Sequence, residues 1–179
     1  MTPVLVGTPV LETERLTLRA PGRDDWPAFN AFIAGPRAEF VRSTAYNPEL
    51  AWRGFGHLVG HWVLRGFGIF VFTLRGETSA LGMAGPWFPE GWPEREIGWS
   101  VWDAGAEGRG YAFEAAAAAR DFAFATLGWD TAVSYIDPAN VRSVALALRL
   151  GAVRDASAPC PAGTGACHVY RHPRPEGRA

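Results

Sequence analysis

Residues 106–115 read AEGRGYAFEA, in which two glycines flank one arginine directly before a helix-forming stretch. At the start of a helix, successive backbone N–H groups lie at the positive end of the helix dipole and can hold a phosphate. Gly108 and Gly110 would let the backbone approach such a ligand closely. Taken alone, the stretch is as typical of an ordinary turn. The P-loop spacing G-x-x-x-x-G-K is absent, and the dinucleotide fingerprint needs a third glycine where this chain has Phe113.

The composition is that of a globular protein without a strong overall charge. Of the 179 residues, 48% are apolar and 13% aromatic, and the formal net charge is −1. This balance argues against a disordered chain, a membrane-spanning protein and a basic nucleic-acid binder. The length suits one domain better than two domains with a linker, so we expect residues 1–179 to form a single domain.

The amino-terminal residues and the cysteines indicate the expected compartment. The start of the chain lacks the basic segment and continuous apolar block of a secretory signal, so we expect a cytoplasmic protein. Cys160 and Cys167 flank the turn-forming sequence PAGTGA and could face each other across a hairpin. In a reducing cytoplasm we expect both to remain thiols. Together with His168 they offer too few ligands for zinc, and no metal is expected.

The hydrophobic periodicity predicts a mixed domain with several consecutive strands. A first helix is expected to be capped by Asp24 or Asp25, with Trp26, Phe29 and other apolar side chains on one face. The expected strands are 15–20, 69–75, 81–88, 95–102, 131–136 and a pair after 152, and the other expected helices are 47–66, 111–127 and 139–150. Three successive strands joined by short turns predict an antiparallel meander, and the element order predicts an α+β domain.

A second motif is REIGWSVW, residues 95–102. In a strand, Glu96, Gly98 and Ser100 share one face. A carboxylate beside a glycine on an otherwise apolar strand is a candidate general base, because burial raises its pKa and the small neighbour leaves room for a substrate. From the strand alone, the simpler interpretation is an edge-facing Glu96 paired with Arg95 or another arginine.

The third motif is IDPANVRSVALALRLGA, residues 136–152. Pro138 is expected to end a strand, and Asn140 stands where a helix cap is expected. The helix would then run to Gly151. By itself the motif indicates only a capped helix.

Taken in this order, the motifs resemble the GNAT superfamily of N-acetyltransferases, most closely its ribosomal-protein-alanine acetyltransferase (RimJ/RimL)-like branch. The resemblance rests on LETERLTLR at 11–19, EIGW at 96–99, EGRGYAFEA at 107–115 and the spacing of Asn140, Ser143 and Gly151. It covers about residues 10–172 and implies an acyl-CoA N-acyltransferase-like domain. The implied fold is a mixed, mostly antiparallel central sheet of about seven strands flanked by about four helices.

The resemblance implies which residues bind acetyl-CoA. The superfamily's loop pattern of Gln or Arg, two residues, Gly, any residue, then Gly or Ala aligns with Glu107, Gly110 and Ala112. The N–H groups of this loop would hold the pyrophosphate, and the residues concerned are Gly108, Arg109, Gly110, Tyr111, Ala112 and Phe113. The strand backbone at Ser100, Val101 and Trp102 would pair with the pantetheine arm as an added strand does. Asn140 would bond the same arm.

Two positions depart from the superfamily's pattern. Glu107 stands where Gln, Arg or a bulky residue is usual and adds a negative charge near the phosphates, which Arg109 would offset. Many members carry a general-acid tyrosine seven residues after the asparagine, where this chain has Ala147. The RimJ/RimL-like branch uses a serine instead, which makes Ser143 the candidate general acid, with a solvent proton as the alternative.

The implied function is acetyl-CoA-dependent N-acetylation of a primary amine by direct attack in a ternary complex. Glu96 would take the amine proton through water, and a backbone N–H near Ser100 or Val101 would stabilise the oxyanion. A small molecule or a protein N-terminus would be the acceptor, with no nucleic-acid or membrane partner and a monomer or homodimer as the assembly. A longer acyl donor is a second possibility. Ala147 and Glu107 favour the remaining alternative, a catalytically silent acyl-CoA-binding or regulatory domain.

Overall fold

The computed structural model describes residues 4–42 and 44–174, which form one mixed sheet with helices on both faces. Within these residues the sheet has eight strands in the order β1-β2-β3-β4-β5-β6-β8-β7. Every neighbouring pair is antiparallel except β5 and β6, which are parallel. The strands are Leu11–Glu12 (β1), Leu16–Arg19 (β2), Phe70–Leu74 (β3), Gly82–Trp87 (β4), Glu96–Val101 (β5), Val133–Ile136 (β6), Val153–Arg154 (β7) and His168–Arg171 (β8). The α+β prediction and the antiparallel meander are confirmed.

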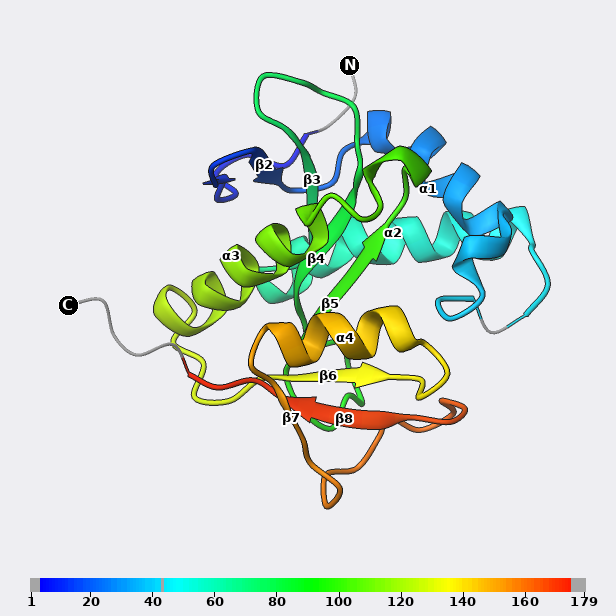
Figure 1. The fold of residues 1–179 in the computed structure, drawn as a ribbon. Helices are drawn as coiled ribbons and strands as arrows, with labels where there is room; N and C mark the ends of the chain where they lie inside the picture. Colours follow the sequence, from blue (N-terminus) through cyan, green and yellow to red (C-terminus); the bar gives the residue numbers. More distant parts are fainter. Residues whose placement is uncertain (1–3, 43, 175–179) are drawn as a thin grey trace.

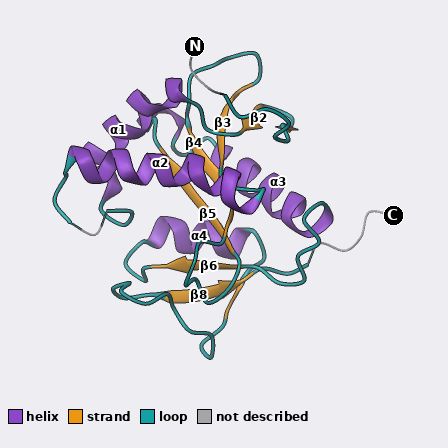
Figure 2. Ribbon diagram, turned by 180° about the vertical axis from the view of Figure 1, so that it is seen from behind, coloured by secondary structure: helices purple, strands orange, loops and turns teal. Residues whose placement is uncertain are grey.

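Four α-helices cover the two faces of the sheet in the described residues (Figures 1 and 2). They are Trp26–Ala34 (α1), Pro48–Arg65 (α2), Tyr111–Ala125 (α3) and Val141–Arg149 (α4). The central strand β3 is buried on both faces: Val71 packs with α1 and α2, and Phe70 and Phe72 pack with α3. No helix of the described chain has the length and apolarity needed to cross a bilayer.

Two details near the amino terminus differ from the sequence predictions. The expected strand 15–20 is found as β2, but a short strand precedes it, because the chain turns at Thr13, whose N–H donates to the Leu16 carbonyl at 2.9 Å. The residues before this turn form β1, which accounts for the eighth strand. Asp25 precedes α1 but does not cap it with its side chain. Its carboxylate instead accepts both terminal nitrogens of Arg19 at 2.7 and 2.8 Å and so ties the start of α1 to β2.

The two cysteines form a disulfide, contrary to the expectation of free thiols. Cys160 and Cys167 lie in the long connection between β7 and β8, with Cα atoms 6.2 Å apart. The turn between them is closed by hydrogen bonds from the N–H and hydroxyl of Thr164 to the Pro161 carbonyl. The turn at PAGTGA thus brings the two side chains together as the sequence allowed, and the prediction of thiols, which rested on a reducing compartment, is wrong.

Strands β5 and β6 separate almost as soon as they meet. Their ladder has a single register pair, Glu96 opposite Val133. One residue further along β6, the Ser134 hydroxyl donates to the Ile97 carbonyl at 2.6 Å and replaces the next ladder bond. Beyond this point the two strands diverge (Figure 1), and the edge of β5 opposite β4 pairs with no further strand of the described residues.

His172 is buried just past β8 and supports this region. Its Nε2 lies 2.9 Å from the Ser134 hydroxyl, while Nδ1 is buried with no hydrogen-bond partner in the described structure. Burial, together with the nearby positive charge of Arg120, lowers the pKa of His172 to about 4. The folded protein therefore holds this imidazole neutral at physiological pH.

We expect His172 to make folding stability depend on pH between about 4 and 6.5. The unfolded histidine takes up a proton near pH 6.5, whereas the folded one does so only near 4. Stability is therefore fully present above pH 6.5 and falls as the pH is lowered, by up to about 3 kcal/mol. His172→Leu should lose much less stability over this interval in urea unfolding at pH 4.5, 5.5 and 7. His57→Gln, at an exposed histidine, is the control, and equal pH dependence in wild type and His172→Leu would contradict the prediction.

Candidate active site

A cavity of about 1090 Å³ lies where β5 ends and where α3 and α4 begin. It collects residues from three motifs that are far apart in the sequence. Its lining includes Ser100, Val101, Gly108, Gly110, Tyr111, Ala112, Phe113, Asn140 and Ser143. Of the residues expected to bind the cofactor, only Trp102 and Arg109 lie outside this lining. The sequence motifs therefore converge on one site.

The glycine-rich loop presents an uncapped helix start to the cavity. Gly108 and Gly110 have φ angles of +71° and +79°, a left-handed conformation that glycine adopts without a steric penalty. Gly110 is the N-cap of α3 and offers no side chain to bond the first-turn N–H groups. Those N–H groups belong to Tyr111, Ala112 and Phe113, which line the cavity. Together with the helix dipole they can hold an anion.

Glu107 is held in an ionic cluster beside this loop. Its carboxylate accepts Arg37 at 2.7 Å, from the turn after α1, and Arg142 at 2.8 Å, from α4. Two positive charges thus surround one negative charge, and the cluster is cationic overall. Arg37 also donates to the Val101 and Trp102 carbonyls, each at 2.8 Å. Arg37 lies outside the three sequence motifs, and Arg142, although within the third, was not predicted as a site residue.

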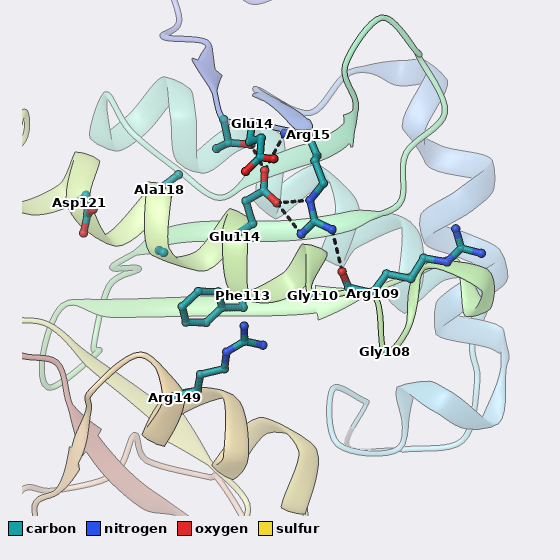
Figure 3. A pocket seen from close by; sticks show the side chains of 12 residues that line it. Glu14, Arg15, Gly108, Arg109, Gly110, Phe113, Glu114, Ala118, Asp121 and Arg149 are labelled. Carbon is teal, nitrogen blue, oxygen red and sulfur yellow. Dashed lines mark hydrogen bonds and ion pairs between the residues drawn. The ribbon is translucent and has the colours of Figure 1, made fainter.

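A second hollow of about 750 Å³ lies on the other side of the same loop (Figure 3). Arg109 lines this hollow rather than the larger cavity, so its side chain does not compensate Glu107 as expected. Arg15 donates to the Arg109 carbonyl at 3.0 Å and forms an ion pair with Glu114 at 2.7 Å. These bonds fasten the back of the loop to β2 and α3. The Arg149 guanidinium lies 4.0 Å above the Phe113 ring.

The edge of β5 determines which backbone groups face the cavity. The Arg95 carbonyl accepts Val133 N–H at 2.9 Å, and the Ile97 carbonyl accepts Ser134, so these residues direct their backbone groups toward β6. Because alternate strand residues direct these groups to opposite edges, Trp99 and Val101 also face the open edge. Trp102 donates its N–H to the Leu81 carbonyl, next to β4, so Ser100, two residues earlier, also directs its backbone groups toward β4.

The structure places the three predicted strand residues differently. Trp102 is buried, its N–H donates to the Leu81 carbonyl at 2.7 Å, and its own carbonyl accepts Arg37. Ser100 lines the cavity but directs its backbone groups toward β4. Trp99, which the sequence did not single out, directs its backbone groups to the open edge, and choosing between alternate residues requires knowing which edge of the strand is free.

At the start of α4, the expected cap is present and adjoins the cavity. The Asn140 side chain accepts the Ser143 N–H at 3.1 Å, which is an N-cap bond. The Ser143 hydroxyl accepts the indole N–H of Trp99 at 3.3 Å. Ala147, at the position of the tyrosine found in many GNAT members, is fully buried between α4 and the sheet. Of the two candidate positions, Ser143 and Ala147, only Ser143 therefore places a hydroxyl group at the cavity.

Glu96 lies at the opposite end of β5 from the glycine loop. At about 3.3 Å per residue it is roughly 16 Å along the strand from Val101. It is partly buried and does not line the large cavity. Burial raises its pKa to about 7, although the Trp92 indole N–H, which donates to it at 2.7 Å, acts in the opposite direction. The simpler interpretation fails, because Arg95 pairs with Asp130 instead.

The chain matches a known family over most of its length. Residues 15–153 match the family model described as an acetyltransferase (GNAT) domain. A solved acetyltransferase from Agrobacterium tumefaciens is 38% identical with a TM-score of 0.87, over 97% of this chain and 99% of that chain. A putative ribosomal-protein-serine acetyltransferase from Vibrio cholerae is 26% identical with a TM-score of 0.73, over 97% and 100% of the two chains.

A more distant solved structure is RimL, a ribosomal-protein α-N-acetyltransferase in complex with coenzyme A. It is 16% identical, with a TM-score of 0.71 over 93% of this chain and 98% of that chain, and supports the likeness of fold. The match to the family model spans the glycine loop, the open strand edge and the capped helix. The chain belongs to the GNAT family of acetyltransferases.

Proposed function

We propose that this GNAT acetyltransferase moves the acetyl group of acetyl-CoA directly to a primary amine in a ternary complex. The observation that carries the proposal is the open edge of β5, which runs from the uncapped helix start at Gly110 toward Glu96. An extended pantetheine arm suits such an edge, because it can bond backbone groups as an added strand does. The thioester of acetyl-CoA supplies an activated acyl group.

The proposed cofactor site has one part for the pyrophosphate and another for the extended pantetheine arm. The N–H groups of Tyr111, Ala112 and Phe113 would receive the pyrophosphate at the positive end of α3. Arg37 and Arg142 neutralise Glu107, so its carboxylate would not repel the phosphates. The pantetheine arm would then bond the backbone of Trp99 and Val101, with Asn140 on the opposite side of the cavity.

Glu96 would act as the general base. With a pKa of about 7, its carboxyl group is substantially ionised at neutral pH yet basic enough to accept a proton from an attacking ammonium or amine through water. The backbone N–H of Trp99 or Val101, on the open edge, would stabilise the developing oxyanion. The Ser143 hydroxyl would return a proton to the departing thiolate.

The acceptor is proposed only as a class. Phe32, Pro36, Phe40 and Val41 line the large cavity on the side of α1. Such a wall suits either an apolar small amine or the first residues of a protein chain. The ribosomal-protein acetyltransferases among the solved relatives favour a protein N-terminus as the first acceptor to test.

A catalytically silent acyl-CoA-binding domain is the second candidate. It is favoured by one contact: Arg37 occupies the Val101 carbonyl on the edge that would receive the arm. Calorimetry with acetyl-CoA, combined with transfer assays on a panel of peptides and small amines, separates the two. Tight binding with no transfer to any acceptor would favour the silent domain.

Glu96→Gln should lower kcat about 100-fold or more, because the amide cannot accept the amine proton. Acetyl-CoA affinity, measured by calorimetry, should stay within about twofold, since Glu96 lies away from the glycine loop. In the wild type, kcat/KM should rise with pH through about 7, as the carboxyl group loses its proton. The matched control is Glu90→Gln, an exposed carboxylate before β5. A wild-type rate that is constant from pH 6 to 9 would remove Glu96 from the mechanism.

Ser143→Ala should lower kcat about tenfold if the hydroxyl protonates the leaving thiolate, and it should leave acetyl-CoA affinity unchanged. Ser143→Thr, which keeps the hydroxyl, should retain most of the activity. The Asn140 cap bonds the backbone N–H of residue 143 and survives both changes. Steady-state kinetics on the three proteins checks this, and an unchanged kcat in Ser143→Ala would assign the proton to solvent.

A further inference from the structure

The loop between β4 and β5, residues 88–95, folds back over Glu96. A bond from Trp92 N–H to the Pro89 carbonyl at 3.3 Å closes its turn. The Trp92 side chain then returns to β5, where its indole N–H donates to Glu96 Oε2 at 2.7 Å. This short bond joins a loop residue to the carboxylate four positions later. Trp92 also packs edge-on to Tyr135 of β6, with the ring centres 6.3 Å apart.

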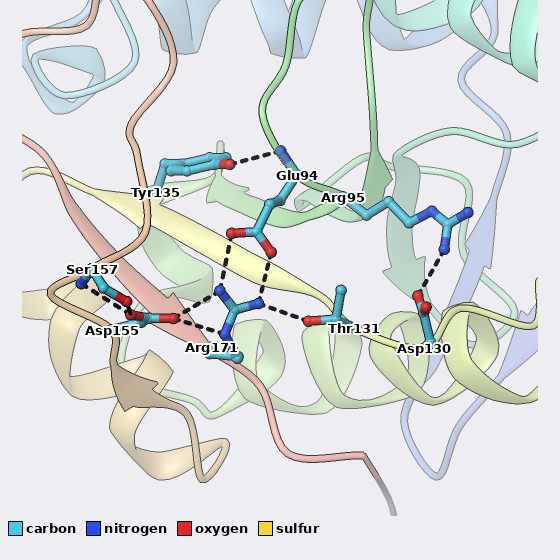
Figure 4. A network of polar contacts seen from close by, with 8 residues as sticks. All are labelled: Glu94, Arg95, Asp130, Thr131, Tyr135, Asp155, Ser157 and Arg171. Atoms are coloured by element: carbon cyan, nitrogen blue, oxygen red, sulfur yellow. Dashed lines mark hydrogen bonds and ion pairs between the residues drawn. The ribbon is translucent and has the colours of Figure 1, made fainter.

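Glu94 connects the end of this loop to strands β6 and β8. Its N–H donates to the Tyr135 hydroxyl at 3.1 Å. Its two carboxylate oxygens accept the two terminal nitrogens of Arg171, on β8, at 2.7 and 2.9 Å. Arg171 is itself held by Asp155 and Thr131, and Figure 4 shows how these groups surround its guanidinium. The bonds between Glu94 and Arg171 are bidentate, a geometry that restricts both side chains.

We propose that Trp92 is a positioning residue for the Glu96 carboxylate, and that the Glu94–Arg171 pair holds the loop in the conformation that makes this possible. The proposal rests on the proposed role of Glu96 as general base. The Trp92 bond to Oε2 restricts the rotation of the carboxyl group, which also accepts a hydrogen bond from the Tyr135 backbone. The loop also shields the carboxylate from bulk water.

The indole bond has a predictable direction of effect. An N–H that donates to a carboxylate favours its ionised form, so loss of the donor raises the pKa of Glu96 further. Other charged or titratable groups face this region from the neighbouring elements. They are Tyr135 of β6, Glu94 of the loop, Arg171 of β8, and His57 and His61 of α2, which contact Trp87 opposite Glu96. A substitution at Trp92 removes none of these groups, although it changes the packing against Tyr135.

The test is Trp92→Phe, which keeps a smaller aromatic ring and removes the N–H donor. We expect the rise of kcat/KM with pH to move upward by about one unit, so that activity at pH 6 falls about tenfold more than activity at pH 9. Glu94→Gln should move the profile in the same direction by a smaller amount. Glu90→Gln, an exposed carboxylate of the same loop that pairs only with Arg65 among the bonds described, should leave it unchanged. An equal loss at every pH, or no change, would overturn the proposal.

A second readout does not require any catalysis. Because burial raises the pKa of Glu96, the folded protein loses stability relative to Glu96→Gln as the pH rises from about 4.5 to 7 and keeps that loss above 7. In the Trp92→Phe background, the same comparison by urea unfolding should place the end of this loss at a higher pH. If no amine is acetylated but this shift is found, the general-base role fails and the positioning role stands. If the shift is absent, the positioning role fails whatever the activity.

Discussion

The separation of β5 from β6 after one register pair is the constraint on which the rest of the structure depends. A buried N–H or carbonyl group without a hydrogen-bond partner is costly, so a strand edge that opens inside a protein must be satisfied in another way. Here the Ser134 hydroxyl takes the Ile97 carbonyl and Arg37 takes the Val101 carbonyl. Helices α3 and α4 begin beside the opening and leave a cavity between their first turns.

The same separation explains how Glu96 can be partly buried and still lie beside the open edge of β5. It stands at the last point where the two strands are paired, so its backbone is fixed by ladder bonds while the strand beyond it is open. Its carboxyl group is contacted by Trp92 of the loop that precedes β5. The surroundings of Glu96 have the low polarity that raises its pKa. Glu96 also adjoins the strand edge along which a substrate would lie.

Sequence reasoning succeeded where the signal is local and failed where it depends on tertiary neighbours. The helix after the glycines and the meander follow from apolar spacing and turn residues, and they are found where expected. Arg37 could not be found, because it reaches Glu107 and β5 from a turn about 65 positions earlier, and long-range ion pairs leave no pattern in a single sequence.

Other misses have equally physical causes. Asp is a residue type that commonly caps helices, but the Arg19 guanidinium competes for the Asp25 carboxylate more strongly than the helix N–H groups do. Trp99 was overlooked in favour of Ser100 because alternation along a strand is readable from sequence, whereas the identity of the free edge is not.

Arg37 connects the turn after α1 with the open edge of β5, so the free energies of these two regions are coupled. It belongs to the turn that follows α1, and the nearby residues Phe32 and Phe40 line the cavity. Its guanidinium bonds the carbonyls of Val101 and Trp102 and the carboxylate of Glu107. Any ligand that takes the Val101 carbonyl competes with this arginine and so alters the packing of that turn. By thermodynamic linkage, a molecule seated against the turn must then change the affinity of the strand edge by the same factor in return.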